Sequence, residues 1–313
     1  MPANLTIVNL TYATTESADV RFADLDAWPP ETVLEVLWES QLAAVAAVRP
    51  ALGPLAGACR AAAHRLAAGG RVIYTGAGTS GRIAAQDGAE LGPTFGWPAE
   101  RVLLLPAGGA EALLRSMENA EDDGESAAKA VRQHAIGAQD VVLALAASGT
   151  TPYTVMLLSA ARRAGALTIG IANSPGTALL EAAEYPVLIE TGAEVIAGST
   201  RLKAGTAQKV VLNLFSSLVM ILLNHVYRGR MVDLQITNAK LARRAVRTVC
   251  ELTGTGEDVA ASLLARAQGN IKRALLLARG LTPEEADRAL ARQGGNLRAA
   301  LASLDHPSAW RAP

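Results

Sequence analysis

Three short stretches of the sequence are rich in the residue types that bind phosphate and sugar groups. Each combines glycine with serine or threonine, so backbone N–H groups can approach a ligand closely and hydroxyls can bond its oxygens. A helix that follows such a loop adds the positive end of its dipole. The stretches are GAGTSGR (76–82), ASGTTPY (147–153) and AGSTRLKAGTAQK (197–209), and the residues expected to contact a ligand are Thr79, Ser80, Ser148, Gly149, Thr150, Thr151, Ser199, Thr200 and Lys203.

The first stretch also fits Gly-x-Gly-x-x-Gly, the pattern of dinucleotide-binding loops. Such sites need an acidic residue near the end of the next strand, about 20 residues beyond the glycines, to bind the ribose. Here that strand ends in LLLPAGG (103–109), without a carboxylate, and Glu100 precedes the strand. The sequence therefore argues against NAD or FAD. A Walker-type phosphate loop is ruled out because no Gly-Lys-Ser/Thr follows.

Two carboxylates are candidates for acid–base catalysis. Glu90 lies in DGAELGPTFGW (87–97), roughly three helical turns beyond Ser80, and Glu121 lies in the acidic run MENAEDDGE (117–125). Each also has a structural interpretation, a solvated helix position for Glu90 and a charged surface for Glu121. The same is true of the three loops, because Ser, Thr and Gly are ordinary turn and N-cap residues.

The elements that position these loops are predicted from alternating apolar runs and longer helix-like segments. The runs are too apolar to leave one face in water, which is typical of a parallel sheet covered on both faces. Ligands of such sheets bind outside the carboxyl ends of the strands, where the three loops lie. The expected strands are 71–75, 101–106, 140–146, 167–172 and 185–190, and the segments between them, including 108–135, are expected to be helical.

Flanking regions are predicted to be helical. Helices are expected from Pro30, after an irregular start, and over 54–68, and VVLNLFSSLVMILL (210–223) is short for a membrane span and suits a buried helix. Beyond residue 250, LARAQGNIKRAL (264–275) and LARQGGNLRAAL (290–301) repeat a helix, a Gly-Asn turn and a helix. Thr282 is expected to cap a helix that starts at Pro283.

Composition narrows the function classes. Lys+Arg and Asp+Glu both number 29, which gives no support for a nucleic-acid or membrane partner. The four histidines lack metal-ligand spacing, so no metal site is expected from them. Cys59 and Cys250 cannot form a disulfide framework, and the N-terminal 22 residues lack a signal-peptide pattern, so we expect a cytoplasmic protein.

Five segments together resemble the N-acetylmuramic acid 6-phosphate etherases of the sugar isomerase (SIS) superfamily. The resemblance is strong over about residues 70–245. It implies a five-stranded parallel sheet with flanking helices, a homodimer with sites near the subunit interface, and a small ubiquitin-associated-like three-helix bundle. The segments are GRVIYTGAGTSGRIAAQDGAELGPTFG, ENAEDD, DVVLALAASGTTPY, GAEVIAGSTRLKAGTAQKVVLNLFSS and MVDLQITNAKL, and the domains are expected at 1–52, 53–245 and 246–313.

The resemblance also implies an activity. Members of that family cleave the D-lactyl ether of N-acetylmuramate 6-phosphate to N-acetylglucosamine 6-phosphate and D-lactate in bacterial cell-wall recycling. Their catalytic glutamates fall on Glu90 and Glu121. Glu90 is expected to protonate the departing lactate and Glu121 to remove the C2 proton, a reaction that needs no cofactor.

The chain departs from the family pattern at three places. AELGPT (89–94) replaces SECPPT, Thr150 stands where an arginine is usual, and Asp19 stands where an asparagine is usual. These departures bear on the substrate more than on the reaction class. Two other functions stay open: a non-enzymatic sugar-phosphate sensor and a sugar-phosphate isomerase that uses the same C2 deprotonation.

Overall fold

The structure, a computed structural model, describes residues 14–305. Residues 1–13, which belong to the expected irregular start and to the stretch judged to lack a signal peptide, lie outside the described residues, and so does His306. The chain forms two compact units: Met1–Gly88 with Val102–Phe215, and Ala89–Arg101 with Ser216–Pro313. The domain boundaries expected after residues 52 and 245 stay a prediction.

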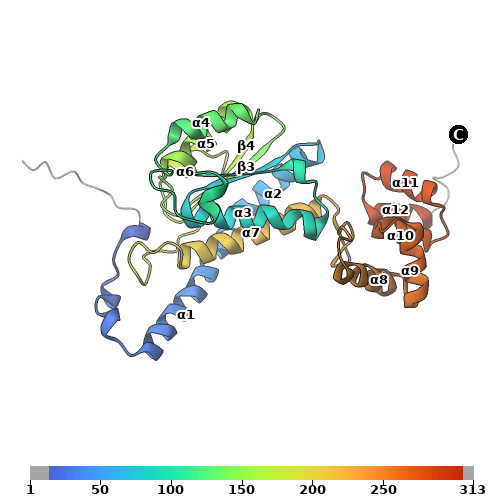
Figure 1. Cartoon of the computed structure of the whole chain (residues 1–313), viewed down its shortest axis with the longest axis horizontal. Coiled ribbons are helices and arrows are strands. Elements are labelled where there is room, and N and C mark those ends of the chain that lie inside the picture. The colour runs from blue at the N-terminus through green and yellow to red at the C-terminus, as the bar shows by residue number, and fades with distance from the viewer. Residues whose placement is uncertain (1–13, 306–313) are drawn as a thin grey trace, which may run out of the picture. The chain divides into compact units, whose positions relative to one another are not determined.

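The first unit is built on the predicted five-stranded parallel sheet (Figure 1). Its order is β2-β1-β3-β4-β5, and all five apolar runs are confirmed as strands. Every residue of β1, β3 and β4 is buried, which explains why these segments are apolar throughout rather than alternating. The strands are β1 (Val72–Gly76), β2 (Val102–Pro106), β3 (Val141–Ala146), β4 (Leu167–Ala172) and β5 (Tyr185–Leu188).

Helices cover the sheet and carry its connections. A buried apolar cluster joins one face of the sheet to α4, α5 and α6, and includes Val142, Leu157 and Leu179. The helix α2 packs against β3, β4 and β5. The helices are α1 (Pro30–Ala46), α2 (Leu52–Ala67), α3 (Gly78–Phe95), α4 (Gly124–Gln133), α5 (Pro152–Arg163), α6 (Ala178–Ala182) and α7 (Lys203–Leu222).

The prediction of one helix across residues 108–135 is wrong for about half of that segment. Only a short 3-10 turn (Ala110–Leu113) and α4 are helical. Gly108, Gly109 and Asn119 have positive φ angles, which a helix cannot contain, and Asp123 caps α4 by accepting from the backbone N–H of Ser126. The acidic run of residues 117–123 is therefore a loop at the edge of the sheet.

The expectation of a helix within 210–223 is confirmed by α7. By length and composition, α7 and residues 30–67 would also suit a membrane span. Half of the apolar window of α7, and a third of the other window, is buried inside the protein, and buried core helices pass the same test.

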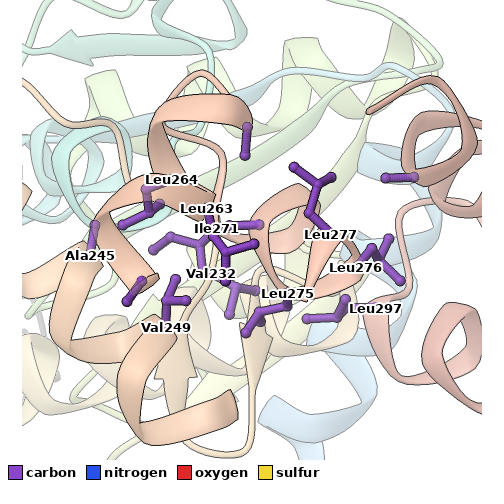
Figure 2. Packing of buried hydrophobic residues seen from close by; sticks show 14 of the residues in the cluster. Val232, Ala245, Val249, Leu263, Leu264, Ile271, Leu275, Leu276, Leu277 and Leu297 are labelled. Atoms are coloured by element: carbon purple, nitrogen blue, oxygen red, sulfur yellow. The ribbon is translucent and has the colours of Figure 1, made fainter. Parts of the chain in front are cut away.

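The second unit contains a helical bundle, as expected. Its buried side chains form one apolar cluster that includes Val249, Leu264, Ile271 and Leu297 (Figure 2). The bundle has more helices than the three expected. They are α8 (Ala239–Thr253), α9 (Glu257–Arg266), α10 (Ile271–Leu277), α11 (Pro283–Arg292) and α12 (Leu297–Asp305).

The internal repeat is confirmed in the bundle. Asn270 caps α10 by accepting from the N–H of Arg273, and Asn296 accepts from the N–H of Ala299 at the start of α12. The glycines before these caps have positive φ angles, so each Gly-Asn pair ends one helix and starts the next. Thr282 forms the expected cap of α11, within a reciprocal capping box with Glu285.

Candidate active site

The strand order determines where a ligand site can form. The strand β1 lies between β2 and β3. The chain runs from β1 to β2 in one direction across the sheet and from β3 to β4 in the other, so the loops that leave β1 and β3 diverge. Doubly wound sheets bind ligands at this switch point. A cavity of about 520 Å³ lies there, and its lining residues are Glu16, Ala77, Gly78, Thr79, Ser80, Glu121, Asp122, Ala146, Ala147, Ser148, Thr150, Thr151, Pro152 and Thr200.

The glycines of the first loop hold the end of β1 against the start of α3. A Cβ on Gly81 would lie 2.6 Å from the carbonyl oxygen of Gly76, and Gly78 has a φ of +53°. The Gly-x-Gly-x-x-Gly pattern is therefore explained by close strand–helix packing and one left-handed residue. Thr79 and the buried Ser80 then line the cavity in the first turn of α3.

The second loop brings three hydroxyls to the cavity. Ser148 Oγ accepts from the N–H of Thr150 at 3.3 Å and pairs with the Thr150 hydroxyl at 3.1 Å. Thr151 precedes α5 and lines the cavity, but its side chain makes no capping bond. Gly149 is not a lining residue; its φ is +71° and a Cβ there would lie 2.2 Å from Thr177 Oγ1, so it fixes the shape of the loop.

The third loop contributes less than expected. Of its predicted contacts, Thr200 lines the cavity, while Ser199 and Lys203 do not. The Lys203 ammonium donates to the carbonyl oxygen of Thr191 at 2.7 Å. The first amides of α7 are also occupied, because the buried Glu194 carboxylate accepts from the N–H groups of Lys203 and Ala204. The start of α7 is therefore satisfied within the protein, which sequence reasoning missed.

Glu121 is positioned by its backbone. The N–H of Tyr153, in the first turn of α5, donates to the Glu121 carbonyl oxygen at 2.9 Å. This bond ties the acidic loop to the helix that follows β3. The exposed Glu121 is also one of the residues that line the cavity with the hydroxyl loops.

Glu90 lies elsewhere. It is an exposed residue of α3, and it is not among the residues that line the cavity. The structure of one chain therefore brings Glu121 together with Thr79, Ser80 and the second loop, but not Glu90.

Glu16 was not among the predicted site residues. It ends the 3-10 turn Thr14–Glu16, and the Thr14 and Thr15 hydroxyls lie 3.2 and 3.5 Å from Ser174 Oγ, after β4. A Cβ on Gly198 would lie 3.1 Å from Glu16 Oε2, so the carboxylate reaches the third loop. Glu16 lies outside the three hydroxyl-rich stretches and follows no predicted strand, so the loop chemistry gave no signal for it.

The charge of the cavity is negative. Its charged lining residues are Glu16, Glu121 and Asp122, and the described residues that line it include no lysine or arginine. A bound anion would rest on hydroxyls and on the first backbone N–H groups of α3, because α5 begins with Pro152, which has no N–H, and the Tyr153 N–H already donates to Glu121. Thr150, in place of the usual arginine, leaves this cavity without a guanidinium.

A smaller hollow adjoins the cavity. Its volume is about 210 Å³, and Ala77, Gly78 and Glu121 line both spaces. The hollow adds Arg82, from the first turns of α3, and residues of the loop that leads to Glu121. Glu121 thus stands between a hydroxyl-lined space and a space that contains a guanidinium.

The second unit has a separate groove of about 470 Å³. Glu251 pairs with Arg230 at 2.7 Å and with Arg247 at 2.8 Å, and three more cations of the groove come from α8. No predicted site residue lines it. Its charged residues are Arg230, Lys240, Arg243, Arg244, Arg247 and Glu251.

Two family models match parts of this chain. Residues 54–162 match the glucokinase regulatory protein N-terminal SIS domain, and residues 114–218 match the SIS domain. A putative sugar-phosphate isomerase from Listeria monocytogenes aligns with a TM-score of 0.49 at 15% identity, covering 64% of this chain and 94% of that one.

Full-length relatives are much more similar. The N-acetylmuramic acid 6-phosphate etherase of Deinococcus radiodurans is 47% identical over 92% of this chain and 94% of its own length. That of Rubrobacter xylanophilus is 42% identical over 94% of this chain and 97% of its own. At this identity and coverage, the chain belongs to the N-acetylmuramic acid 6-phosphate etherase family, whose members are carbon–oxygen lyases with an SIS domain.

Proposed function

We propose that this chain cleaves the D-lactyl ether of N-acetylmuramate 6-phosphate, giving N-acetylglucosamine 6-phosphate and D-lactate. The observation that carries the proposal is the cavity at the switch point, which hydroxyl residues of three loops line together with Glu121. The hydroxyls suit a sugar phosphate, and the carboxylate supplies a base beside it. Relatives with the name of this enzyme match nearly the whole chain.

The reaction follows from the chemistry of the open sugar chain. Opening of the ring exposes the C1 aldehyde, so the proton on C2 lies next to a carbonyl and a carboxylate can remove it. Glu121 is the base in this proposal. The electron pair forms the C2–C3 double bond as the C3–O bond breaks, and Glu90 protonates the departing lactate oxygen. Water then adds to the double bond, with hydroxide at C3 and a proton at C2.

The substrate phosphate is proposed to lie against the starts of α3 and α5. Thr79, Ser80, Ser148 and Thr150 offer hydroxyls there. Ser199 and Lys203 remain candidates for binding the substrate, although neither lines the cavity. The Lys203 ammonium is also already bonded to the Thr191 carbonyl oxygen. We also infer that the protein works in the cytoplasm, without a nucleic-acid or membrane partner.

Glu90 does not line the cavity of its own chain. For Glu90 to act as the acid, it must therefore reach the cavity of another copy of the chain. A homodimer provides one, because a two-fold axis brings the same surfaces of two copies together. We propose that each site combines Glu121 of one protomer with Glu90 of the other.

An exposed apolar stripe on α1 supports the homodimer. Leu34, Trp38, Leu42 and Val45 recur at helical spacing and are 67%, 61%, 53% and 48% exposed. The sequence periodicity predicted the helix, but this face stays uncovered in one chain. Large exposed apolar faces of this kind are typical of protein interfaces.

A non-enzymatic sugar-phosphate sensor is the second candidate, because the regulatory-protein SIS domain matches residues 54–162. Assay of D-lactate after incubation with N-acetylmuramate 6-phosphate separates the two. Release of D-lactate with equimolar N-acetylglucosamine 6-phosphate supports the etherase. Binding of the substrate with no lactate supports the sensor, and interconversion of aldose and ketose phosphates instead supports an isomerase.

A further inference from the structure

Arg82 is a guanidinium for which the described residues supply no partner. It is half-buried on α3, two residues beyond Ser80, and no hydrogen bond or ion pair joins it to another described residue. Two other arginines of the first unit are paired, Arg71 with Asp140 and Arg115 with Glu111. Holding a charged group half-buried without a partner costs free energy, so a ligand is a reasonable counterpart.

The surroundings of Arg82 suit a small carboxylic acid. Arg82 is the only cation that lines the 210 Å³ hollow among the described residues. Ala107, Ala112 and Met117 supply apolar atoms beside it. A planar guanidinium binds a carboxylate through two parallel hydrogen bonds, and a methyl group would contact the apolar side chains.

The hollow and the large cavity share part of their lining. Ala77, Gly78 and Glu121 line both spaces, so a ligand can occupy both while Glu121 stands at the junction. A sugar phosphate in the large cavity would then place a substituent near its C2 and C3 atoms into the hollow. In the proposed function, that substituent is the lactyl group.

We propose that Arg82 binds the carboxylate of the ether substituent and makes this hollow the subsite for a three-carbon acid. This inference rests on the proposed function. Arg82 is then a specificity-determining residue: it selects substrates with a carboxylate and holds the C3–O bond beside Glu121. The hydroxyls of the cavity, with no cation among them, are left to bind the phosphate and the sugar.

Two substrates and three variants test the subsite. The substrates are N-acetylmuramate 6-phosphate and its carboxamide, which keeps the ether but loses the negative charge. For Arg82→Gln, kcat/KM on the acid should fall on the order of 100-fold, because the carboxylate loses a charged, bidentate partner. On the carboxamide it should change little. Arg82→Lys should recover part of the loss on the acid. Arg115→Gln is the matched control, since Arg115 is exposed and does not line the hollow, and it should behave as wild type on both.

Equal losses on the acid and the carboxamide would overturn the proposal, and so would unchanged activity on the acid. A binding measurement separates this from the proposed function. D-lactate should bind to the wild type and not to Arg82→Gln, while N-acetylglucosamine 6-phosphate should bind both alike. If the wild type releases no lactate from the acid, the proposed function fails. If both proteins bind D-lactate equally, the subsite alone fails.

Discussion

At the scale of single residues, the candidate site depends on which side chains the loops bring together. Glu121 comes from an irregular loop, but its carbonyl oxygen accepts from the Tyr153 N–H, so the start of α5 fixes its position. Burial raises the pKa of Tyr153 to about 12, with a smaller contribution from Asp123, so this phenol stays protonated during catalysis.

Glu121→Gln should abolish lactate release. The amide keeps the size of the side chain but cannot accept the C2 proton, and loss of a general base costs about 10²–10⁴-fold in kcat. Binding of N-acetylglucosamine 6-phosphate, measured by calorimetry, should change little. Glu125→Gln is the control, because Glu125 lies in the first turn of α4 and does not line the cavity. Near-wild-type kcat in Glu121→Gln would remove Glu121 from the mechanism.

Part of the candidate site could be predicted from the sequence alone. Thr79, Ser80, Ser148, Thr150, Thr151 and Thr200 line one cavity, as the loop chemistry suggested. The internal partners of Lys203 could not be read from its spacing, because Thr191 and Glu194 reach it through the folded connection after β5. The position of Glu16 depends in the same way on tertiary contacts.

At the scale of elements, the apolar runs predicted every strand of the sheet, because fully buried strands have a distinctive composition. The segment before α4 was harder. Its composition suits a helix, but the residues with positive φ and the Asp123 cap delay the helix to Gly124. Local turn chemistry there outweighs average helix propensity.

The junction of β1 and α3 gives a prediction about stability. In Gly81→Ala, the new Cβ would lie 2.6 Å from the Gly76 carbonyl oxygen, so α3 must shift. We expect a loss of about 1–3 kcal/mol in the free energy of unfolding and a raised KM, as Thr79 and Ser80 move. Gly57→Ala in α2 is the control: nothing lies within 4 Å of its Cβ, so its stability should be equal or up to about 1 kcal/mol higher. Equal melting temperatures of the two variants would contradict this account of the glycine pattern.

Asp140, which directly precedes β3 at the amino ends of the strands, gives a prediction about pH. Burial alone would raise the pKa of Asp140, but the Arg71 guanidinium and the Gly137 N–H hold it below the usual value. A carboxyl with a lowered folded-state pKa stabilises the fold above its unfolded pKa of about 3.9, and the contribution is lost as pH falls through the folded-state pKa.

Asp140→Asn should therefore melt at a lower temperature than wild type at pH 7. The gap should narrow as the pH falls below about 4, where the wild-type carboxyl takes up a proton. Thermal melts from pH 7 down to pH 3 measure this difference. Activity per folded molecule should be unchanged. Asp140 precedes the amino end of β3, whereas the cavity lies at the carboxyl end of that strand. A gap that widens on acidification would show that the sign of this pKa shift is wrong.

At the scale of the whole molecule, equal numbers of acidic and basic residues conceal local charge. The cavity of the first unit has three carboxylates and no cation among its described lining residues. The groove of the second unit has five cations and one carboxylate. Composition gave no indication of either, because charge is separated only when the chain folds.

Mixing two inactive variants tests the shared site of the proposed homodimer. Glu90→Gln and Glu121→Gln should each be inactive alone. If Glu90 acts in the site of the partner, refolding them together at equal concentration should restore about a quarter of wild-type activity, since half the dimers are mixed and each has one intact site. D-lactate release measures the recovery.

A mixture that stays inactive would contradict a site shared between subunits. Size-exclusion chromatography with light scattering serves as the control for assembly. When Trp38→Asp is added to both variants, the mixture should contain monomers and should not recover lactate release. The substitution places a charge in the apolar stripe of α1.

The central claim is that the C3–O bond of the sugar breaks by elimination and that water then adds at C3. Turnover of N-acetylmuramate 6-phosphate in ¹⁸O-labelled water, followed by mass spectrometry of both products, tests it most directly. We expect one ¹⁸O in N-acetylglucosamine 6-phosphate, at the C3 hydroxyl, and none in D-lactate. Label in the lactate instead would mean that water attacks the lactyl carbon, which would contradict the roles given to Glu121 and Glu90.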